Sequence, residues 1–421
     1  MSRNYRAPRG TRDILPVEIE RWHRVEQAAH RLFQRYGYRE IRTPIFERRE
    51  LFERGVGETS EIVEKQMYIF QDRGGDWLAL RPEGTAPVIR AFVEHAMHQA
   101  APPYRYYYIG PMFRHERPQK GRFRQFHQIG VEVLGESDPA TDAEVIAMSH
   151  RLLETLRVQN CELELNSIGC AVCRPRYLER LVAYFSGVKE QLCPDCQRRL
   201  ERNPLRILDC KNEQCRHLTT GAPDIKDAWC EDCRSHFEAV LEVLDRINVP
   251  YRRNPFLVRG LDYYMRTTFE FIAGELGAQN AVLGGGRYDG LVRDLGGPDW
   301  PGVGFAIGME RLIKLLPPVE ETSPLDVTVI PLDAESRAVA LAWAEQARQS
   351  GVRVWVRMKI TRLKSGLRAA HRSGARFTLM IGPDERARGR WTLRNMATGE
   401  QQDLPPDELL AYLRKNPVNP S

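Results

Sequence analysis

Residues 110–128 combine the charges and glycines that phosphate chemistry requires. They read Gly-Pro-Met-Phe-Arg-His-Glu-Arg-Pro-Gln-Lys-Gly-Arg-Phe-Arg-Gln-Phe-His-Gln. One strand is expected to end near Phe113 and another to begin near Phe126, so the basic residues fall in the connecting loop. Five cations within eleven residues repel one another unless an anion lies among them. Because guanidinium groups bind phosphate oxygens in pairs, we predict a phosphate or nucleic-acid clamp rather than a solvated basic hairpin.

Eight of the nine cysteines form four closely spaced pairs. The pairs are Cys170 with Cys173, Cys193 with Cys196, Cys210 with Cys215, and Cys230 with Cys233. Two such pairs make a closed tetrahedral site of four thiolates, which is typical of structural Zn²⁺. We expect one or two zinc sites, whose pairing the sequence leaves open; Cys210 with Cys215 is the least regular pair.

Two alternatives to zinc exist for these thiols. Disulfides are not expected, because the first residues contain no apolar signal segment and we predict a cytoplasmic location. Redox chemistry by one Cys-x-x-Cys pair is the other alternative. Cys161 stands apart in an apolar alternation and is predicted to be a core residue.

Four further segments are rich in glycine and polar residues: 80–85, 258–264, 284–290 and 302–311. Neither the G-x-G-x-x-G fingerprint nor a phosphate-binding P-loop occurs among them. Taken alone, each glycine run therefore favours a tight turn or close strand packing over a ligand site.

Hydrophobic periodicity predicts the elements that position these segments. Helices are expected at 17–36, 85–98, 141–156 and 309–316. Strands are expected at 41–46, 67–70, 77–80, 104–109, 129–134, 256–258, 267–271 and 303–306. This order predicts an α+β domain, with a largely antiparallel sheet flanked by helices, from residues 1–169 and 240–318. The Cys-rich stretch 170–239 is predicted to be a mainly helical insertion.

The last quarter of the chain has a different character. A polar linker at 319–324 precedes a β-α-β-α-β pattern at 325–421, which predicts a small α/β domain. This domain holds 16 Lys/Arg and 10 Asp/Glu, so it carries the whole net charge of +6. Such an excess favours a nucleic-acid partner over a solvated basic surface. Trp355 and Trp391 are expected in its core rather than stacked on bases.

Taken together, the segments resemble class II aminoacyl-tRNA synthetases. Residues 113–128 resemble motif 2 and residues 302–311 resemble motif 3. Residues 42–46 resemble motif 1, whose proline-bearing element makes a homodimer interface in that class. Four segments narrow the resemblance to the histidyl-tRNA synthetase family: 9–13, 81–85, 259–264 and 285–290.

The resemblance implies that ATP activates histidine to an adenylate, with release of pyrophosphate, before transfer to the 3′ end of tRNA(His). The implied histidine-binding residues are Glu83, Thr85, Gln128, Glu132, Arg259, Tyr263 and Tyr264. The implied ATP-binding residues are Arg114, Glu116, Arg122 and Arg311. Arg114 and Arg259 are implied to act on the α-phosphate, with Mg²⁺ at the pyrophosphate moiety. Gln119 is implied to contact the acceptor stem, and residues 325–421 to bind the anticodon.

Two other functions compete with this one. A non-catalytic relative of the family is the regulatory subunit of ATP phosphoribosyltransferase, but it typically lacks the segment at 259–264 and the C-terminal domain. A zinc-stabilised RNA-binding protein without catalysis is the second alternative, and the implied substrate residues disfavour it. A membrane protein is excluded, since no stretch of about 18 apolar residues occurs.

Overall fold

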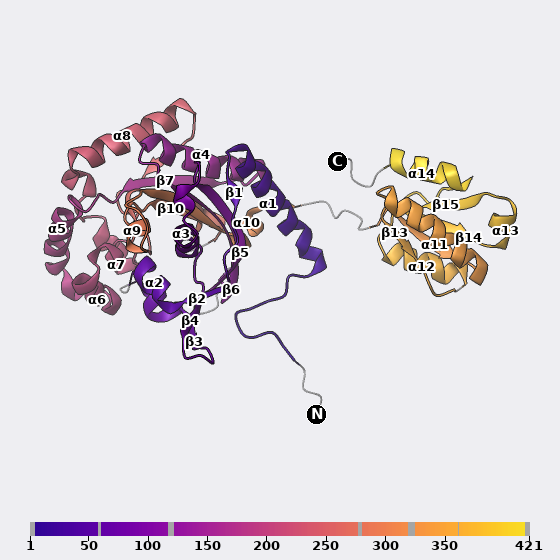
Figure 1. Cartoon of the computed structure of the whole chain (residues 1–421), viewed down its shortest axis with the longest axis horizontal. Coiled ribbons are helices and arrows are strands. Elements are labelled where there is room, and N and C mark those ends of the chain that lie inside the picture. The colour runs from indigo at the N-terminus through magenta and orange to yellow at the C-terminus, as the bar shows by residue number, and fades with distance from the viewer. Residues whose placement is uncertain are drawn as a thin grey trace. The chain divides into compact units, whose positions relative to one another are not determined.

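The computed structural model describes residues 5–57, 60–116, 122–276, 280–318, 325–360 and 362–416. The chain divides into two compact units, Met1–Pro317 and Pro318–Ser421 (Figure 1). Among the described residues, no helix has the length and apolar character needed to span a membrane.

An eight-stranded sheet forms the centre of the first unit, in the order β1-β5-β6-β11-β10-β9-β7-β8. Only β1 with β5 and β7 with β8 pair in parallel, so the predicted largely antiparallel sheet is confirmed. The strands are β1 (Arg39–Glu40), β5 (Arg105–Phe113), β6 (Gln125–Leu134), β7 (Cys161–Ser167), β8 (Arg252–Arg253), β9 (Met265–Ala273), β10 (Ala281–Arg287) and β11 (Gly302–Gly308).

Helices cover this sheet because their apolar stripes need a partner surface. One core joins the sheet to α1 (Pro16–Arg35), α4 (Pro139–Thr155), α8 (Glu231–Arg246) and α10 (Met309–Leu315). A second core lies around α3 (Thr85–Glu94) and α9 (Leu291–Asp294). Shorter helical elements are α2 (Arg49–Val56), η1 (Ile62–Gln66), η2 (Met97–Gln99) and η6 (Gly274–Leu276).

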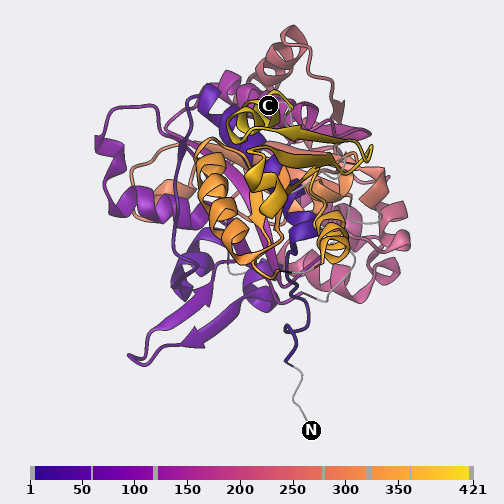
Figure 2. The same ribbon diagram turned by 90° about the vertical axis from the view of Figure 1, so that its right-hand side faces the viewer.

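A three-stranded sheet, in the order β2-β4-β3, projects from the first unit (Figure 2). Its strands are β2 (Phe46–Arg48), β3 (Tyr68–Gln71) and β4 (Trp77–Leu80). Several large apolar side chains on and beside it are exposed, among them Ile45, Phe46, Ile69, Phe70 and Trp77.

Two predicted strands are wrong. Instead of one strand at 41–46, β1 ends before that segment and β2 begins at Phe46. Pro44 has no amide hydrogen with which to continue a ladder. Residues 256–258 form no strand, because the side-chain amide of Asn166 donates to the carbonyls of Pro255 and Leu257, each at 3.1 Å. The Asn166 side chain thereby supplies hydrogen bonds that a neighbouring strand would otherwise donate to this backbone.

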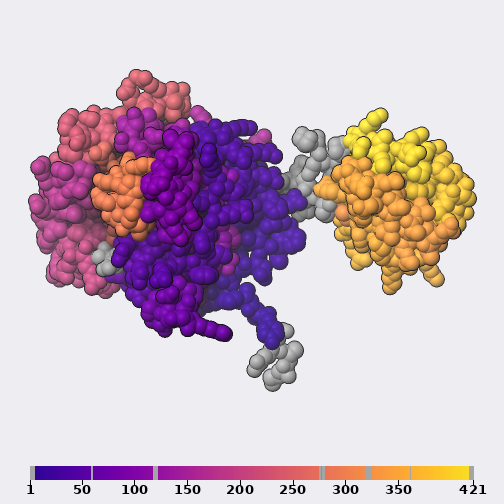
Figure 3. All heavy atoms as spheres, in the orientation of Figure 1, coloured from indigo at the N-terminus to yellow at the C-terminus, as the bar shows by residue number. Residues whose placement is uncertain are grey.

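The Cys-rich insertion is mainly helical, as predicted. It contains η3 (Lys189–Gln191), η4 (Pro204–Ile207), η5 (Ile225–Ala228), α5 (Arg174–Ser186), α6 (Pro194–Arg202), α7 (Glu213–Thr219) and the start of α8. Its buried Leu181 and Leu200 belong to the same apolar core as Ile89 and Phe92 of α3. The insertion forms one end of the first unit (Figure 3, magenta to pink).

The second unit contains a five-stranded sheet in the order β13-β12-β14-β15-β16. Its strands are β12 (Val327–Pro331), β13 (Val354–Val356), β14 (Phe377–Ile381), β15 (Trp391–Asn395) and β16 (Gln401–Leu404), and its helices are α11 (Ala334–Gln349), α12 (Leu363–Arg372), α13 (Pro383–Ala387) and α14 (Pro406–Lys415). The β-α-β-α-β prediction is confirmed for the parallel part; β15 and β16 add an antiparallel edge. Trp391 is buried as expected, whereas Trp355 is exposed.

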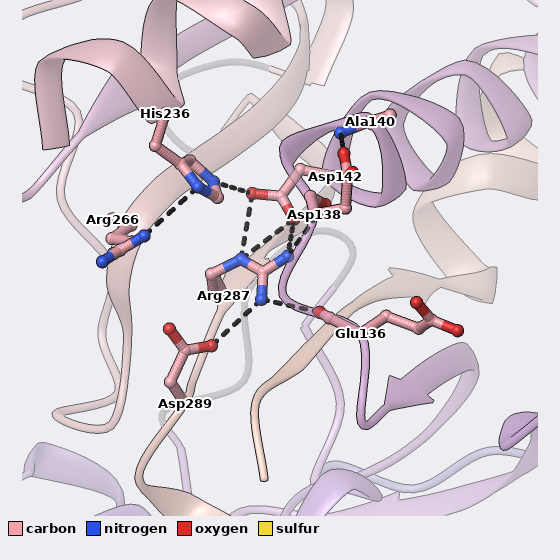
Figure 4. Close-up of polar contacts among 8 residues, drawn as sticks. All are labelled: Glu136, Asp138, Ala140, Asp142, His236, Arg266, Arg287 and Asp289. Carbon is pink, nitrogen blue, oxygen red and sulfur yellow. Dashed lines mark hydrogen bonds and ion pairs between the residues drawn. The ribbon is translucent and has the colours of Figure 1, made fainter. Parts of the chain in front are cut away.

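A buried ion pair ties the returning helix of the insertion to the central sheet (Figure 4). Arg287 of β10 and Asp142 of α4 are both fully buried, and the guanidinium Nε donates to the Asp142 carboxylate at 3.0 Å. His236 of α8 lies 2.9 Å from the same carboxylate. Burial would raise the pKa of Asp142, but the His236 hydrogen bond and the Arg287 charge outweigh it and lower that pKa.

We predict that Arg287→Met lowers the unfolding free energy of the first unit by about 3–5 kcal/mol, because it leaves a buried carboxylate short of its main partner. Hydrogen exchange of β10 and α4 peptides measures this loss for the first unit separately. The control is Arg293→Met, which removes an exposed pair with Asp299 and should cost less than about 1 kcal/mol. Equal effects of the two changes would contradict the prediction.

Candidate active site

A cavity of about 680 Å³ opens on the first unit. It brings together segments that are far apart in the sequence, as a substrate site must. The predicted residues that line it are Glu83, Thr85, Arg114, Glu116, Arg122, Gln128, Arg259, Tyr263, Tyr264 and Arg311. Glu132 lies directly behind this lining, and Gln119 falls outside the described residues.

Glu83 and Thr85 occupy the start of α3. The Glu83 carboxylate accepts hydrogen bonds from the backbone amides of Thr85, at 2.7 Å, and Ala86, at 3.0 Å. These amides are the free donors of a helix N-terminus, where a negative charge is favoured. Burial raises the pKa of Glu83, while the two amides act in the opposite direction. The helix therefore fixes a carboxylate at the cavity wall.

Glu132 of β6 is a buried carboxyl with two hydroxyl partners. Thr85 Oγ1 donates to Glu132 Oε1 at 2.7 Å, and the Tyr288 hydroxyl donates to Oε2. Burial raises the pKa of Glu132 to about 8, although both hydroxyls oppose the shift. Gly304 of β11 makes room for this carboxyl, since a Cβ there would lie 2.3 Å from Oε2.

Three tyrosine rings form an aromatic wall beside Glu132. The rings of Tyr263 and Tyr264 have centroids 4.7 Å apart, and Tyr263 meets Tyr288 edge-on at 5.7 Å. Gln128 Oε1 is buried and has no hydrogen-bond partner within the part of the chain that the structure describes. This end of the cavity offers carboxyl, amide and phenol groups to a polar ring.

Three arginines gather at the other end. Arg114 Nε donates to the Pro82 carbonyl at 2.9 Å, and Arg311 Nη1 donates to the Ala281 carbonyl at 2.7 Å. Arg122 pairs with Glu116 at 2.6 Å. Burial lowers the pKa of Arg311, and the nearby charge of Arg122 lowers it further. Cations held this close favour an anion among them.

Arg259 bridges the two ends of the cavity. Its guanidinium forms an ion pair with Glu270 of β9 and lies 5.7 Å from the centre of the Tyr264 ring. Burial would lower the pKa of Arg259, but Glu270 outweighs it and raises the pKa. A Cβ at Gly284 of β10 would lie 2.3 Å from the guanidinium. The glycine thus clears the space that Arg259 occupies.

Of the glycine-rich segments, the glycines at 284–286 and 302–304 lie in strands rather than in turns, whereas those at 84, 260 and 290 lie outside strands. Gly284 and Gly304 lie within β10 and β11, where glycine is uncommon unless another group approaches closely. Close strand packing, the other expected explanation, holds at Gly285, whose added Cβ would lie 2.3 Å from the Gly304 carbonyl oxygen.

Two residues of the predicted motifs serve mainly to hold the site together. Arg81 is buried and donates to the backbone carbonyls of Thr43, at 3.0 Å, and Pro111, at 2.9 Å. Glu310 accepts from the His127 amide at 2.9 Å. These contacts join the segments that resemble motifs 1 and 3 to the strands β5 and β6.

Four residues that contact or line the site were not predicted from the sequence: Tyr288, Glu270, Arg206 and Asp209. Tyr288 lies in a glycine-rich segment that had already been singled out. Glu270 alternates with phenylalanines in β9, and a carboxylate in such a run was an available signal. No local pattern marked Arg206 or Asp209.

The eight paired cysteines form two groups of four, which settles the pairing that the sequence left open. The first cysteine cluster contains Cys170, Cys173, Cys230 and Cys233, and the second contains Cys193, Cys196, Cys210 and Cys215. Within each, the ligand atoms all lie within 4.8 Å of one another.

The sulfur separations fit a tetrahedral metal site. Cys170 Sγ lies 3.8 Å from Cys173 Sγ and 3.7 Å from Cys230 Sγ, and Cys193 Sγ lies 3.8 Å from Cys210 Sγ. Zn–S bonds of about 2.3 Å place the corners of a tetrahedron roughly 3.8 Å apart. A disulfide requires about 2.05 Å. Both clusters therefore have the geometry of four-thiolate zinc sites.

We predict that Glu132→Gln stabilises the substrate-free protein at high pH. The folded pKa of about 8 lies above the ordinary value of 4.5 for a glutamate. The stability that the protonated carboxyl provides is therefore complete below about pH 4.5 and lost as pH rises through about 8. The variant should therefore gain a few kcal/mol over the wild type between these limits. Urea unfolding at pH 5.5 and pH 9 measures the difference.

Glu238→Gln on the exposed face of α8 controls for the loss of one negative charge. This control should show no comparable gain between pH 5.5 and pH 9. A constant stability difference between Glu132→Gln and the wild type across that range would contradict the raised pKa.

Comparisons with known proteins agree with this arrangement. A family model described as histidyl-tRNA synthetase matches residues 10–172 and 205–312, and one described as anticodon binding domain matches 326–416. The histidine–tRNA ligase of Halothermothrix orenii is 49% identical over 416 residues, covering 97% of this chain and 99% of its own length. That of Solibacter usitatus is 50% identical over 409 residues, covering 97% and 98%.

A solved structure of apo Staphylococcus aureus histidyl-tRNA synthetase is 36% identical. It superposes with a TM-score of 0.82, over 98% of this chain and all of its own. The cavity, the order of the segments that line it and these matches lead to one conclusion: the chain belongs to the histidyl-tRNA synthetase family.

Proposed function

We propose that this chain is a histidine–tRNA ligase, which activates histidine with ATP and transfers it to tRNA(His). The observation that carries the proposal is one cavity with a buried carboxyl and three tyrosines at one end and three arginines at the other. The first end suits an imidazole and an ammonium group, and the second suits phosphates. Arg259 lies between them, where a carboxylate would meet the α-phosphate.

The chemistry requires placement more than a protein nucleophile. The histidine carboxylate attacks the α-phosphorus of ATP, a bond to that phosphorus forms, and pyrophosphate leaves. Negative charge grows on the phosphate oxygens, and fixed guanidinium groups at Arg114 and Arg259 stabilise it. Glu83 and Thr85 hold the ammonium group, while Glu132 and Tyr264 orient the ring. The tyrosine wall and the buried Glu132 reject amino acids that cannot hydrogen-bond there.

Mg²⁺ belongs to this proposal as the partner of the ATP phosphates. The carboxylates at the arginine-rich end are Glu116 and Glu270, and oxygen ligands of this kind together with phosphates suit Mg²⁺. The bound ion would neutralise charge on the departing pyrophosphate. Glu116 also keeps Arg122 in place through their ion pair.

The tRNA would contact both units. Residues 325–421 carry the excess positive charge and are proposed to bind the anticodon, with the exposed Trp355 available for stacking on a base. Gln119 is proposed to contact the acceptor stem. We further propose that residues 170–239 act as an inserted module on the catalytic part, 1–169 and 240–318. A cytoplasmic location completes the proposal, since tRNA and reduced thiolates occur together there.

The alternative of a regulatory subunit is less consistent with the chain. The segment 259–264 supplies Arg259, Tyr263 and Tyr264 to the cavity, and a second domain matches an anticodon-binding model. Both are features that such a subunit typically lacks. A pure RNA-binding protein would have no use for the buried Glu132.

Amino-acid-dependent exchange of pyrophosphate into ATP, measured with each of the twenty amino acids, tests the function. Exchange with histidine alone supports it. Absence of exchange with histidine, in protein shown to be folded, defeats it.

Arg259→Ala is expected to lower the rate of pyrophosphate exchange by about 10²–10³-fold, because one fixed cation at the α-phosphate is lost. The matched control is Arg246→Ala, an exposed arginine of α8, which should leave the rate unchanged. Near-normal exchange by Arg259→Ala would remove that residue from its proposed role.

We predict two zinc ions per chain, one in each cysteine cluster. Elemental analysis of protein purified without chelators measures the ratio. Cys161→Ser should retain both ions, since Cys161 belongs to neither cluster. Zinc-free wild-type protein, with its thiols reduced, contradicts the metal assignment while leaving the ligase assignment intact.

A homodimer is proposed through the exposed apolar side chains of the β2-β4-β3 sheet. Phe46 and Trp77 are each more than half exposed in the single chain, at 53% and 52%. A large exposed apolar patch favours a protein partner. We expect Phe46→Glu combined with Trp77→Glu to convert the dimer to a monomer in analytical ultracentrifugation. Ile247→Glu, an exposed apolar position elsewhere, should leave the assembly intact.

A further inference from the structure

The second cysteine cluster lies at the substrate cavity itself. Two of its members, Cys193 and Cys210, line the cavity that also contains Glu83 and Arg259. The polar residues of the same stretch that line the cavity are Asp195, Arg199, Arg206, Asp209, Lys211 and Asn212. One wall of the cavity therefore comes from the insertion.

Part of this wall has little regular structure to hold it. After η4 ends at Ile207, residues 208–212 form neither helix nor strand before α7 begins. Side chains of Leu200 and Ile207 anchor the flanking elements in the apolar core. Leu208 of the irregular stretch is buried in the same core, and beyond it Cys210 joins the stretch to the sulfur cluster before α7 begins. Irregular backbone without such a link belongs to the least stable parts of a fold.

Besides this apolar core, partly exposed polar contacts attach the wall to the catalytic part. Asn203 Nδ2 donates to Asp262 Oδ1 at 3.0 Å, and Arg202 pairs with Glu64 at 3.1 Å. Glu61 lies 3.9 Å from Arg206. Partly exposed ion pairs of this kind contribute about 0–1 kcal/mol each. They are weaker than four metal–thiolate bonds.

The charges of this wall act on the central arginine of the site. Burial raises the pKa of Glu270 and the charge of Arg259 opposes that shift; Asp209 raises the pKa further, and Lys211 lowers it. Arg206 lies against the backbone of the segment that carries Arg259, since a Cβ on Gly260 would lie 2.8 Å from Arg206 Nη1. Displacing residues 206–212 would change the field around the Arg259–Glu270 pair.

We propose that Zn²⁺ in the second cysteine cluster positions residues 206–212 as a wall of the substrate cavity, so that ATP affinity depends on the occupancy of this one metal site. This inference rests on the proposed function. Asp209 and Lys211 line this wall on either side of Cys210. The first cysteine cluster instead joins the two ends of the insertion, where the chain leaves β7 and enters α8.

The ligands of the second cluster lie only partly within the residues that match the family model. The matching family model skips residues 173–204, which include Cys193 and Cys196. Two of the four ligands of the second cluster therefore lie outside the matched residues, whereas the sheet and its arginines lie inside them.

The test compares two double variants of the full chain. Cys210→Ser with Cys215→Ser removes two ligands of the second cluster, and Cys230→Ser with Cys233→Ser removes two of the first. Calorimetry measures the Kd of a non-hydrolysable ATP analogue and, separately, of histidine. Elemental analysis counts the remaining zinc, and hydrogen exchange reports on 204–212 and on β6 and β11.

The second-cluster variant should keep one zinc per chain and lose exchange protection at 204–212 while β6 stays protected. Its Kd for the ATP analogue should rise about 10- to 100-fold, as for other groups that support a site indirectly. Its Kd for histidine should rise less, because Arg259 meets only the carboxylate of histidine, whereas Glu132 and Thr85 hold its ring and its ammonium group. An unchanged Kd for the ATP analogue in a variant that has lost that zinc overturns the proposal.

If the cysteine variants misfold, Asp209→Asn combined with Lys211→Met, which keeps all eight cysteine ligands, tests whether this wall supports binding of the ATP analogue. It should retain two zinc ions and weaken binding of the ATP analogue; unaltered binding overturns the proposed positioning. These binding measurements do not depend on turnover. Wild-type protein that fails to exchange pyrophosphate defeats the proposed function, whereas intact exchange with metal-independent ATP binding defeats only this inference.

Discussion

The site depends on one constraint: its charged groups are buried against the glycines of β10 and β11, where water cannot stabilise them. Glu132 and Arg259 both lie where a strand residue is glycine, Gly304 in one case and Gly284 in the other. A buried carboxyl and a buried guanidinium each cost free energy unless hydrogen bonds or opposite charges surround them. The fold meets that cost with Thr85 and Tyr288 around the carboxyl, and with Glu270 beside the arginine. Substrate then enters a site whose polar groups are already oriented.

The buried pair behind the site has a related role. Arg287 follows directly after the glycines of β10, and its guanidinium reaches Asp142 at the start of α4. Through His236 the same carboxylate contacts α8, the helix that returns from the insertion. A strand that lacks side chains at its centre is thus fixed at its end by a strong polar contact. This contact helps to hold the register of a strand that packs through Val282 and Leu283 at its start but has no side chains at 284–286.

Much of the fold followed from periodicity, but particular residues defeated it. The strand prediction at 41–46 failed at Pro44, and the one at 256–258 failed because Asn166, about ninety positions earlier, satisfies the backbone there. Strand β10 was not predicted, since three consecutive glycines favour a turn unless the bulk of Arg259 is known. The histidine and ATP residues were named through family resemblance, whereas Glu270 and Asp209 depend on which strands and loops become neighbours. The pairing of the cysteines could not be predicted for the same reason, because it depends on which segments of the folded chain become neighbours.

That pairing is nested: the first and fourth pairs share one cluster, and the second and third share the other. Cys230 follows Cys170 by 60 residues, which corresponds to roughly 3–12 seconds of synthesis at about 5–20 residues per second. The last ligand of the second cluster, Cys215, is synthesised fifteen residues before Cys230. The second cluster can therefore bind its metal before the first cluster has all of its ligands. β7 cannot pair at that stage either, since its antiparallel neighbour β9 begins only at Met265. During translation, the order of the cysteines thus lets the insertion assemble before the strands that complete the central sheet have been made.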